Sequence, residues 1–268
     1  MTATRLPTYF ISHGGGPWPW MKEQMGGAYD RLEAALARMP ADIGATPRAV
    51  LMLSAHWEAP RFTVQTHANP PMLHDYSGFP EFTYHIRYPA PGAPDVASRV
   101  RALLADAGIA SGEDAARGFD HGMFAPMAVI WPQADMPTLQ LSLRQGLDPA
   151  EHLALGRALA PLRDEGILIV GSGLSYHNLH AFGPAAHAPS AAFDAWLEAT
   201  LAIADASARA QALAAWERAP AARLAHPREE HLLPLMVALG AAQGEAATRV
   251  YHERDFFGGI TVSSYRFG

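Results

Sequence analysis

The 268-residue chain contains no cysteine and only one lysine, Lys22. The absence of cysteine excludes disulfide bonds, iron–sulfur clusters and thiolate catalysis. Any transition-metal site in this chain must therefore be built from histidine, aspartate and glutamate side chains. The lack of thiols also fits a reducing compartment, and we expect a cytoplasmic protein.

Positive charge and long apolar runs are also scarce. The formal net charge is −6, so the chain has no basic footprint for nucleic acid or an anionic membrane surface. No basic-then-apolar leader opens the sequence, and no apolar run approaches the roughly 20 residues that span a bilayer. Since 49% of residues are hydrophobic and 17% charged, a substantial core can form. We expect neither nucleic acid nor a membrane as a partner.

Apolar runs of strand length alternate with alanine-rich segments of helix length. The run at 48–55 is almost continuously apolar, which is typical of a strand covered on both faces. The alternation predicts an α/β fold in which residues 1–268 form a single αβα sandwich with a mixed central sheet and a metal site at the sheet edge. The expected strands are 7–12, 48–55, 137–143, 166–172, 248–254 and 260–267, and the expected helices are 20–39, 93–107, 122–131, 149–164, 190–205, 207–217 and 229–242.

The segment 68–94 is rich in proline and glycine and is too long for an ordinary connection between elements. We expect a functional loop or lid, because such loops often carry binding residues. Its aromatic side chains, Tyr76 and Phe79 among them, would suit a wall over an aromatic ligand. The alternative is that these rings only pack the loop onto the body of the protein.

Three histidines, His13, His56 and His177, each follow a strand-like run within a few residues. Because ligands collect beyond the carboxyl ends of strands in α/β sheets, we expect the three imidazoles at one edge. A lone histidine there is more often structural, but three at equivalent positions favour a metal or catalytic site. His231 lies at the start of a predicted helix and could complete the set. His121 follows an aspartate and precedes a helix, so it either bonds substrate or caps that helix.

The glycines at 14–16 let backbone approach a ligand and expose N–H groups. They do not form a phosphate loop, since no Gly-Lys-Ser/Thr follows. His180, three residues after His177, more plausibly supports the loop than binds a metal. The sequence has no Gly-x-Ser-x-Gly elbow, no dinucleotide-binding glycine motif and no His-Glu-x-x-His helix.

Several short motifs in a fixed order resemble the class III extradiol ring-cleavage dioxygenases, the superfamily of the protocatechuate 4,5-dioxygenase catalytic subunit. Within that superfamily the likeness is greatest to the 4,5-DOPA extradiol dioxygenase-like branch. The matching pieces extend over nearly the whole chain: Ser12-His-Gly-Gly, Leu53-Ser-Ala-His-Trp57, Leu73-His-Asp-Tyr-Ser-Gly-Phe-Pro80, Tyr88-Pro-Ala-Pro-Gly92, Gly118-Phe-Asp-His-Gly122, Gly171-Ser-Gly-Leu-Ser-Tyr-His-Asn178, His226-Pro-Arg-Glu-Glu-His-Leu-Leu-Pro-Leu235 and Ser263-Ser-Tyr-Arg-Phe267.

The resemblance implies one divalent metal ion per chain, Fe(II) for catalysis or Zn(II) as described for the DOPA-type branch. His13 and His56 match two histidine ligands of the family. His231 stands where other members place a carboxylate ligand, so a third histidine would replace it. His177 matches the active-site base, and in the DOPA-type branch it would also touch the metal.

A small aromatic diol and O2 are the substrates that the resemblance implies, and it leaves a homodimer open. His177 would take protons from the diol, and either His177 or His121 would return a proton as the ring opens. We expect substrate contacts from the residues Tyr76, Phe79, Gly14, Gly15 and Ser175.

Two other functions compete with ring cleavage. A zinc hydrolase could use the same three histidines with a metal-bound water whose pKa falls to about 7. A relative that keeps the fold could also bind ligands without catalysis, although the retention of His13, His56, His177 and His231 together with His121 argues against it.

Overall fold

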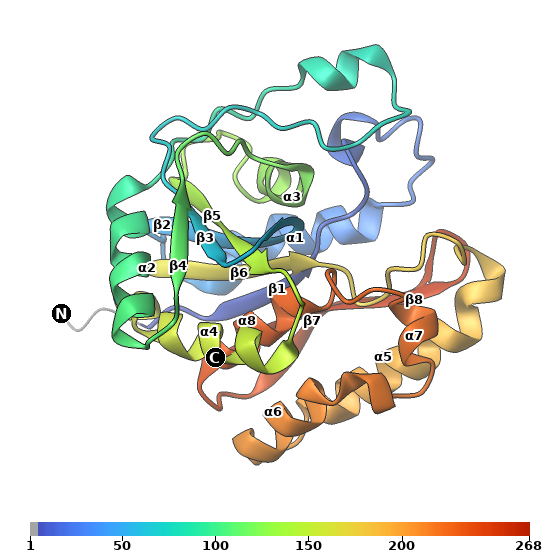
Figure 1. Cartoon of the computed structure of the whole chain (residues 1–268). Helices are drawn as coiled ribbons and strands as arrows, with labels where there is room; N and C mark the ends of the chain where they lie inside the picture. Colours follow the sequence, from blue (N-terminus) through green and yellow to red (C-terminus); the bar gives the residue numbers. More distant parts are fainter. Residues whose placement is uncertain (1–4) are drawn as a thin grey trace.

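The computed structural model describes residues 5–268, which build one mixed sheet with helices on both of its faces (Figure 1). The eight strands are β1 (Thr8–Ser12), β2 (Ala49–Ala59), β3 (Phe62–Gln65), β4 (Ser111–Asp114), β5 (Thr138–Arg144), β6 (Ile167–Gly173), β7 (Ala247–Phe256) and β8 (Ile260–Phe267). Their order across the sheet is β4-β3-β5-β2-β6-β1-β8-β7. The central strands β5, β2, β6 and β1 are parallel, whereas β8 and β7 continue the sheet in antiparallel fashion.

The helices form two layers. α1 and α3 pack against each other on one face, and α2, α4 and α8 cover the other; α6 packs against α4 and α8, and α5 packs against α6 and β8 (Figure 1). The α-helices are α1 (Asp30–Ile43), α2 (Pro94–Asp106), α3 (His121–Ile130), α4 (Pro149–Leu159), α5 (His187–Leu201), α6 (Ala206–Ala214), α7 (Ala222–Ala225) and α8 (Leu233–Ala242). Short 3-10 helices are η1 (Trp18–Trp20), η2 (Glu81–His85), η3 (Ala160–Arg163), η4 (Pro184–Ala186) and η5 (Trp216–Arg218).

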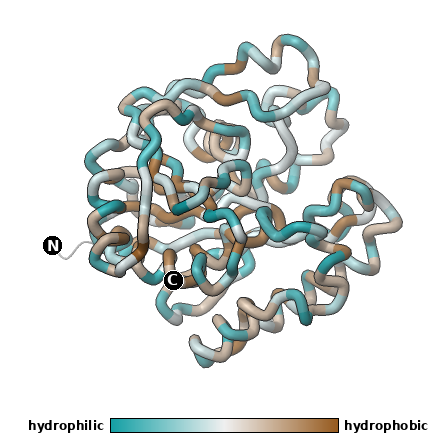
Figure 2. The backbone as a smooth tube through the Cα atoms, viewed as in Figure 1, coloured by the Kyte–Doolittle hydropathy of each residue, from teal (hydrophilic) through white to brown (hydrophobic). Residues whose placement is uncertain are grey.

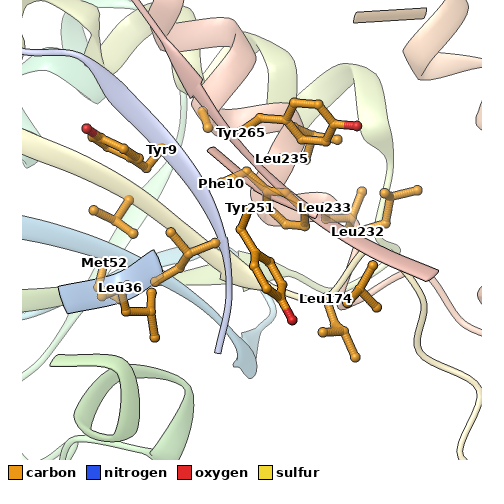
Figure 3. Packing of buried hydrophobic residues seen from close by; sticks show 14 of the residues in the cluster. Tyr9, Phe10, Leu36, Met52, Leu174, Leu232, Leu233, Leu235, Tyr251 and Tyr265 are labelled. Atoms are coloured by element: carbon orange, nitrogen blue, oxygen red, sulfur yellow. The ribbon is translucent and has the colours of Figure 1, made fainter. Parts of the chain in front are cut away.

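Successive residues of β2 belong to two different cores. Val50 and Met52 pack in the larger cluster, whereas Leu51 and Leu53 pack in the cluster beneath α2 and α4. Side chains alternate across a strand, so a strand buried on both faces needs apolar residues at every position. Figure 2 shows the hydrophobic segments concentrated in the interior, and Figure 3 shows part of the larger cluster around Phe10 and Met52.

The sandwich predicted from the sequence is confirmed, with differences at the ends of elements. The predicted helix 20–39 is wrong in its first half: α1 starts at Asp30, because Gly26 and Gly27 adopt left-handed φ angles of 56° and 82°. The predicted helix 149–164 becomes 3-10 after Leu159, next to Pro161, which removes a backbone donor. The short strands β3 and β4 were not predicted.

Two boundary shifts affect the histidines. β2 runs on to Ala59, so His56 lies inside the strand near its end rather than after it. α8 begins at Leu233 instead of residue 229, so His231 stands two residues before the helix. Within residues 5–268, no helix has the length and apolar composition that crossing a membrane would require.

Candidate metal centre

The carboxyl ends of β1, β6 and β2 lie side by side. Ser12 of β1 pairs with Gly173 of β6, and Ser54 of β2 pairs with Ser172 of β6. His13, which follows β1, therefore lies near His56, which lies close to the end of β2. His121, the first residue of α3, joins them from the adjacent helix layer.

His231 reaches this edge because α8 approaches β6 unusually closely. A Cβ atom on Gly173 would lie 2.1 Å from the carbonyl oxygen of His231, so only glycine allows the contact. The amide of Leu174 then donates to that same carbonyl at 3.1 Å. The chain turns after β6, and this turn places His177 beside His231.

The imidazoles of His13, His56 and His231 form a nearly equilateral triangle. Their ring centroids are 4.9, 5.3 and 5.0 Å apart for the pairs 13–56, 13–231 and 56–231. Rings bound to one tetrahedral ion through nitrogens about 2.0–2.1 Å from the metal have centroids about 5 Å apart. The triangle therefore has the size that one shared metal ion requires.

The other two histidines pack against members of this triangle. The ring of His177 stacks on that of His231 with centroids 3.3 Å apart and an angle of 16° between the planes. His121 lies 3.9 Å from His56. Both separations are shorter than two ligands of a tetrahedral ion adopt. By the spacing of ligand atoms alone, two other sets are compact enough to hold an ion: His13, His56 and His121, and His177, Glu230 and His231. Each of these sets contains one of the two short ring separations, so the triangle fits the ligands of one tetrahedral ion better.

Hydrogen bonds behind His13 fix its tautomer. Ser172 donates its only hydroxyl proton to the carbonyl of Gly122, so the Nδ1 of His13, 2.9 Å from the Ser172 oxygen, must carry the proton that it shares with that oxygen. The Nε2 of a neutral His13 then presents a lone pair. It faces the Nε2 of His56 at 3.1 Å. In the metal-free protein the Nε2–H of His56 can donate to this lone pair. With the proton of His56 on Nδ1 instead, facing Asp75, both Nε2 atoms present lone pairs and one cation could bind them both.

Two carboxylates, Asp75 and Glu230, hold the outer nitrogens of four rings. Asp75 Oδ1 accepts from Nδ1 of His121 at 2.9 Å, and Asp75 Oδ2 lies 3.4 Å from Nδ1 of His56. Glu230 Oε1 lies 2.9 Å from Nδ1 of His231 and 3.4 Å from Nδ1 of His177. Histidine ligands of metals usually donate their other N–H to such a group, which fixes the tautomer and increases ligand basicity.

Sequence reasoning missed both carboxylates as site residues. The only signals were their positions, Asp75 inside the long loop 68–94 and Glu230 directly before His231. The loop thus contributes to the site chiefly through Asp75, which also accepts the backbone N–H of His121 at 2.9 Å and so caps α3.

Burial keeps the triangle neutral. Desolvation, followed by the neighbouring imidazoles, lowers the pKa of His13 and of His231 well below the usual value, and desolvation lowers the pKa of His56 to about 4. Burial would raise the pKa of Asp75, but hydrogen bonds and charges from His121 and His56 outweigh it and lower that pKa to about 2. Near neutral pH the centre therefore combines uncharged nitrogen donors with an ionised carboxylate.

A cavity of about 280 Å³ opens beside the histidines. This is just below the roughly 300–1,000 Å³ found for ligand pockets, and it suits a small ligand with one ring. A larger cavity of about 590 Å³ between α4, α6 and α8 is lined by none of these histidines. The smaller cavity is lined by His13, Gly14, Gly15, Gly16, Tyr29, His56, His121, Leu174, His177, Leu179, Phe182, His231, Phe256 and Phe257.

The residues expected to contact substrate lie at different distances from this cavity. Gly14 and Gly15 line it, and Gly14 has a left-handed φ of 80° that places its backbone against Trp18. Tyr76 and Phe79 do not line it: the Tyr76 ring lies 5.9 Å from that of His121, and Phe79 lies behind Gly16. Ser175 is buried, and its hydroxyl accepts from the backbone N–H of Ser263 at 2.8 Å.

The aromatic wall of the cavity comes from elsewhere in the chain. Phe182 follows β6, Phe256 and Phe257 lie at the turn between β7 and β8, and Tyr29 precedes α1. Nothing in the local sequence marked these residues, because they meet only when the turn after β7 folds against the segment between β6 and α5. The exposed His180 does not line the cavity.

Comparison with known proteins gives consistent matches along the chain. The sequence profile of the family described as "Catalytic LigB subunit of aromatic ring-opening dioxygenase" matches residues 7–268. A 4,5-DOPA dioxygenase extradiol from Beta vulgaris is 40% identical over 226 residues, which is 82% of this chain and 83% of that protein. The 4,5-DOPA dioxygenase extradiol of Escherichia coli K12 is 33% identical over 273 residues, 100% of this chain and 97% of that protein.

Two further relatives extend the comparison. The dioxygenase tasH from Hapsidospora irregularis is 36% identical over 281 residues, which is 98% of this chain and 85% of that protein. The crystal structure of an uncharacterized protein from Escherichia coli K12 superposes with a TM-score of 0.79 at 28% identity and covers 98% of this chain and 100% of that one.

Proposed function

This chain belongs to the family of the catalytic LigB subunit of aromatic ring-opening dioxygenases, and we propose that it is a metal-dependent extradiol dioxygenase that opens the ring of a catechol-type substrate with O2. The observation that carries the proposal is the triangle of neutral imidazoles next to a cavity for one aromatic ring. The family membership supports oxygenase chemistry over the zinc hydrolase and over a binding protein without catalysis.

His13, His56 and His231 would hold one divalent metal ion. The fit rests on the size of the triangle and on the two Nε2 atoms that face each other at 3.1 Å. Iron(II) at this position would bind the diol and O2 side by side and couple the two redox partners. The carboxylates Asp75 and Glu230 would orient the ligand rings from behind and supply the negative charge that the three neutral ligands lack.

His177 would act as the acid–base group. It stacks on His231 at a distance that leaves no room for both rings around one tetrahedral ion, which favours the base role over direct ligation. With a proton on Nδ1, next to Glu230, its Nε2 can accept a proton from the diol. His121, which Asp75 orients in the same way, is placed to return a proton as the ring opens.

The cavity would position the flat substrate and exclude water. Gly14 and Gly15 let backbone lie against one edge of the ring, and the Phe182, Phe256 and Phe257 rings offer apolar contact on the other side. Holding the diol in one orientation converts a bimolecular encounter into a reaction between fixed neighbours.

Reconstitution tests the proposal directly. Metal-free protein is loaded without oxygen with Fe(II) or with Zn(II), and each form is mixed with catechols in the presence and absence of O2. We expect O2 uptake and a yellow ring-opened product only with Fe(II) and O2 together. Hydrolysis of an added aryl ester by the Zn(II) form in the absence of O2 would favour the hydrolase, and binding of catechol without turnover in any form would favour a binding protein.

A further inference from the structure

The walls of the histidine cavity carry no permanently charged side chain that could form an ion pair with a charged substituent. Among the residues that line it within residues 5–268, none is lysine, arginine, aspartate or glutamate. Asp75 and Glu230 lie behind the histidine rings, where they face Nδ1 atoms. Because they are engaged there, neither carboxylate is available to pair with an ammonium group of a substrate in the cavity.

Two large apolar side chains are exposed to water at this cavity. Four large hydrophobic residues of the described chain are exposed, and two of them, Leu179 at 68% and Phe257 at 37%, line the cavity. The other two, Phe82 and Leu224, do not. When a ligand covers an apolar side chain that is exposed to water at the opening of a cavity, the removal of apolar surface from water stabilises the complex.

Phe257 is also held in an unfavourable backbone conformation. Its φ is 50°, in the left-handed region, where a bulky residue is a genuine outlier. The residues that follow, Gly258 and Gly259, would tolerate such angles without cost, yet the aromatic side chain stands at this position. The hairpin turn imposes positive φ angles on all three residues, so the presence of phenylalanine where glycine would fit indicates a use for its side chain.

Neighbouring rings fix Phe257 at the opening. Its centroid lies 5.2 Å from that of Tyr29 and 5.8 Å from that of Phe182, both in edge-to-face geometry. In Figure 1 the turn between β7 and β8 lies beside the segment between β6 and α5, which carries Phe182 and Leu179. The opening is therefore bordered by a preorganised apolar surface.

We propose that the preferred substrate is a catechol whose ring substituent is uncharged and apolar and packs against Leu179 and Phe257. This inference rests on the proposed ring cleavage and narrows its substrate class. A substituent ending in a carboxylate or an amino acid group would lose water at this opening without gaining a partner, which penalises it. The preference thus differs from the substrate in the names of the DOPA dioxygenase relatives.

A matched pair of ligands tests the preference. 4-Propylcatechol and 3-(3,4-dihydroxyphenyl)propanoate have side chains of three carbons, but the second ends in a carboxylate. Affinities for the Fe(II)-loaded protein are measured by calorimetry without oxygen, and kcat/KM is measured after O2 is admitted. We expect 4-propylcatechol to be favoured by about tenfold or more in both measurements, as for other sites that leave a desolvated polar group unpaired.

Variants at the opening localise the effect. Leu179→Arg should improve binding of the propanoate and reduce the preference several-fold, whereas Phe82→Arg, which adds the same charge away from the cavity, should leave the preference unchanged. Phe257→Gly removes the ring at a position where glycine is conformationally suited, so the protein should fold and lose affinity for 4-propylcatechol alone.

The experiments distinguish an error in the proposed substrate class from an error in the proposed ring-cleavage function. Equal affinities, a preference for the propanoate, or the same shift in both arginine variants would overturn the inference while ring opening persists. Binding that favours 4-propylcatechol with no O2-dependent turnover of any catechol would support the apolar substrate class and reject the ring-cleavage function.

Discussion

Replacing Asp75 with asparagine exchanges one carboxylate oxygen for an amide nitrogen. The carboxylate of Asp75 lies against the Nδ1 atoms of two imidazoles, those of His121 and His56. Oδ1 accepts the backbone N–H and the Nδ1 proton of His121, both at 2.9 Å, and Oδ2 faces Nδ1 of His56 at 3.4 Å. In Asp75→Asn the amide oxygen can satisfy one imidazole, but the amide nitrogen then presents a donor to the other. If His121 keeps its partners, His56 must move its proton from Nδ1 to Nε2, and that nitrogen could no longer bind the proposed metal ion.

The expected loss follows from the kind of contact that is removed. A hydrogen bond to a charged group contributes about 1.5–3 kcal/mol, and removing the outer partner of a metal-bound histidine costs about 10–100-fold in metal affinity. These figures agree, because tenfold corresponds to about 1.4 kcal/mol. We therefore expect the dissociation constant for Zn(II) or Fe(II) to rise by about 10–100-fold in Asp75→Asn.

The assay is a competition between protein and a chromophoric chelator for the metal, with thermal unfolding of the metal-free variant as a check of folding. Asp106→Asn serves as the control, since Asp106 is exposed at the end of α2. Wild-type metal affinity in a folded Asp75→Asn protein would refute the role of the carboxylate in orienting His56.

Three further predictions concern the base, the loop and the effect of pH. His177→Ala should lower turnover about 10²–10⁴-fold with metal content retained by elemental analysis; loss of the metal would instead make His177 a ligand. Tyr76→Ala and Phe79→Ala should leave the KM for catechol nearly unchanged, because neither ring lines the cavity, whereas Phe182→Ala should raise it several-fold at unchanged metal content; a several-fold rise in the loop variants alone would show that 68–94 contacts the substrate. In the metal-free protein, buried histidines have lowered pKa values, so the unfolded state takes up protons first as the pH falls below about 6.5. The four histidines with strongly lowered pKa values are His13, His56, His226 and His231. The free energy of unfolding, measured with urea, should therefore be greatest above pH 7 and should fall towards pH 5, by as much as about 5 kcal/mol per pH unit if all four contribute. A free energy of unfolding that does not change over this range would contradict the neutral state of the four rings.

The elements that the sequence predicts well are those buried on both faces. The continuous apolar run in β2 indicates a central strand that is covered on both faces. The carboxyl ends of such parallel strands lie at the same edge of the sheet. β3 and β4 escaped prediction because they have four residues each, and Ser111–Asp114 is polar enough to read as a turn. The first half of the helix predicted at 20–39 failed because local glycine conformations outweighed helical periodicity.

The histidines of the centre could be predicted, but not the groups that control them. His13 and His56 follow apolar strand patterns that can be recognised in a single sequence. The hydrogen-bond partner of a side chain depends instead on contacts between distant segments. Asp75 is 46 residues from His121, and Phe257 meets Phe182 only through the packing of a hairpin turn. Such contacts leave no periodic pattern, so the tautomers, the outer carboxylates and the apolar wall required the three-dimensional structure.

If His13, His56 and His231 hold the metal ion as proposed, the charge balance of the centre explains how a third histidine could stand in place of a carboxylate ligand. His13, His56 and His231 are neutral, so they contribute no charge to offset a divalent cation. Asp75 and Glu230 both remain ionised near neutral pH: for each, burial raises the pKa, but hydrogen bonds and neighbouring charges outweigh it and lower the pKa below its usual value. The two negative charges therefore stand one imidazole away from the metal position and formally balance a 2+ ion. In this arrangement the charge that a directly bound carboxylate would provide is transmitted through Nδ1–H bonds, and the position next to the cavity stays free for the oxygens of the substrate.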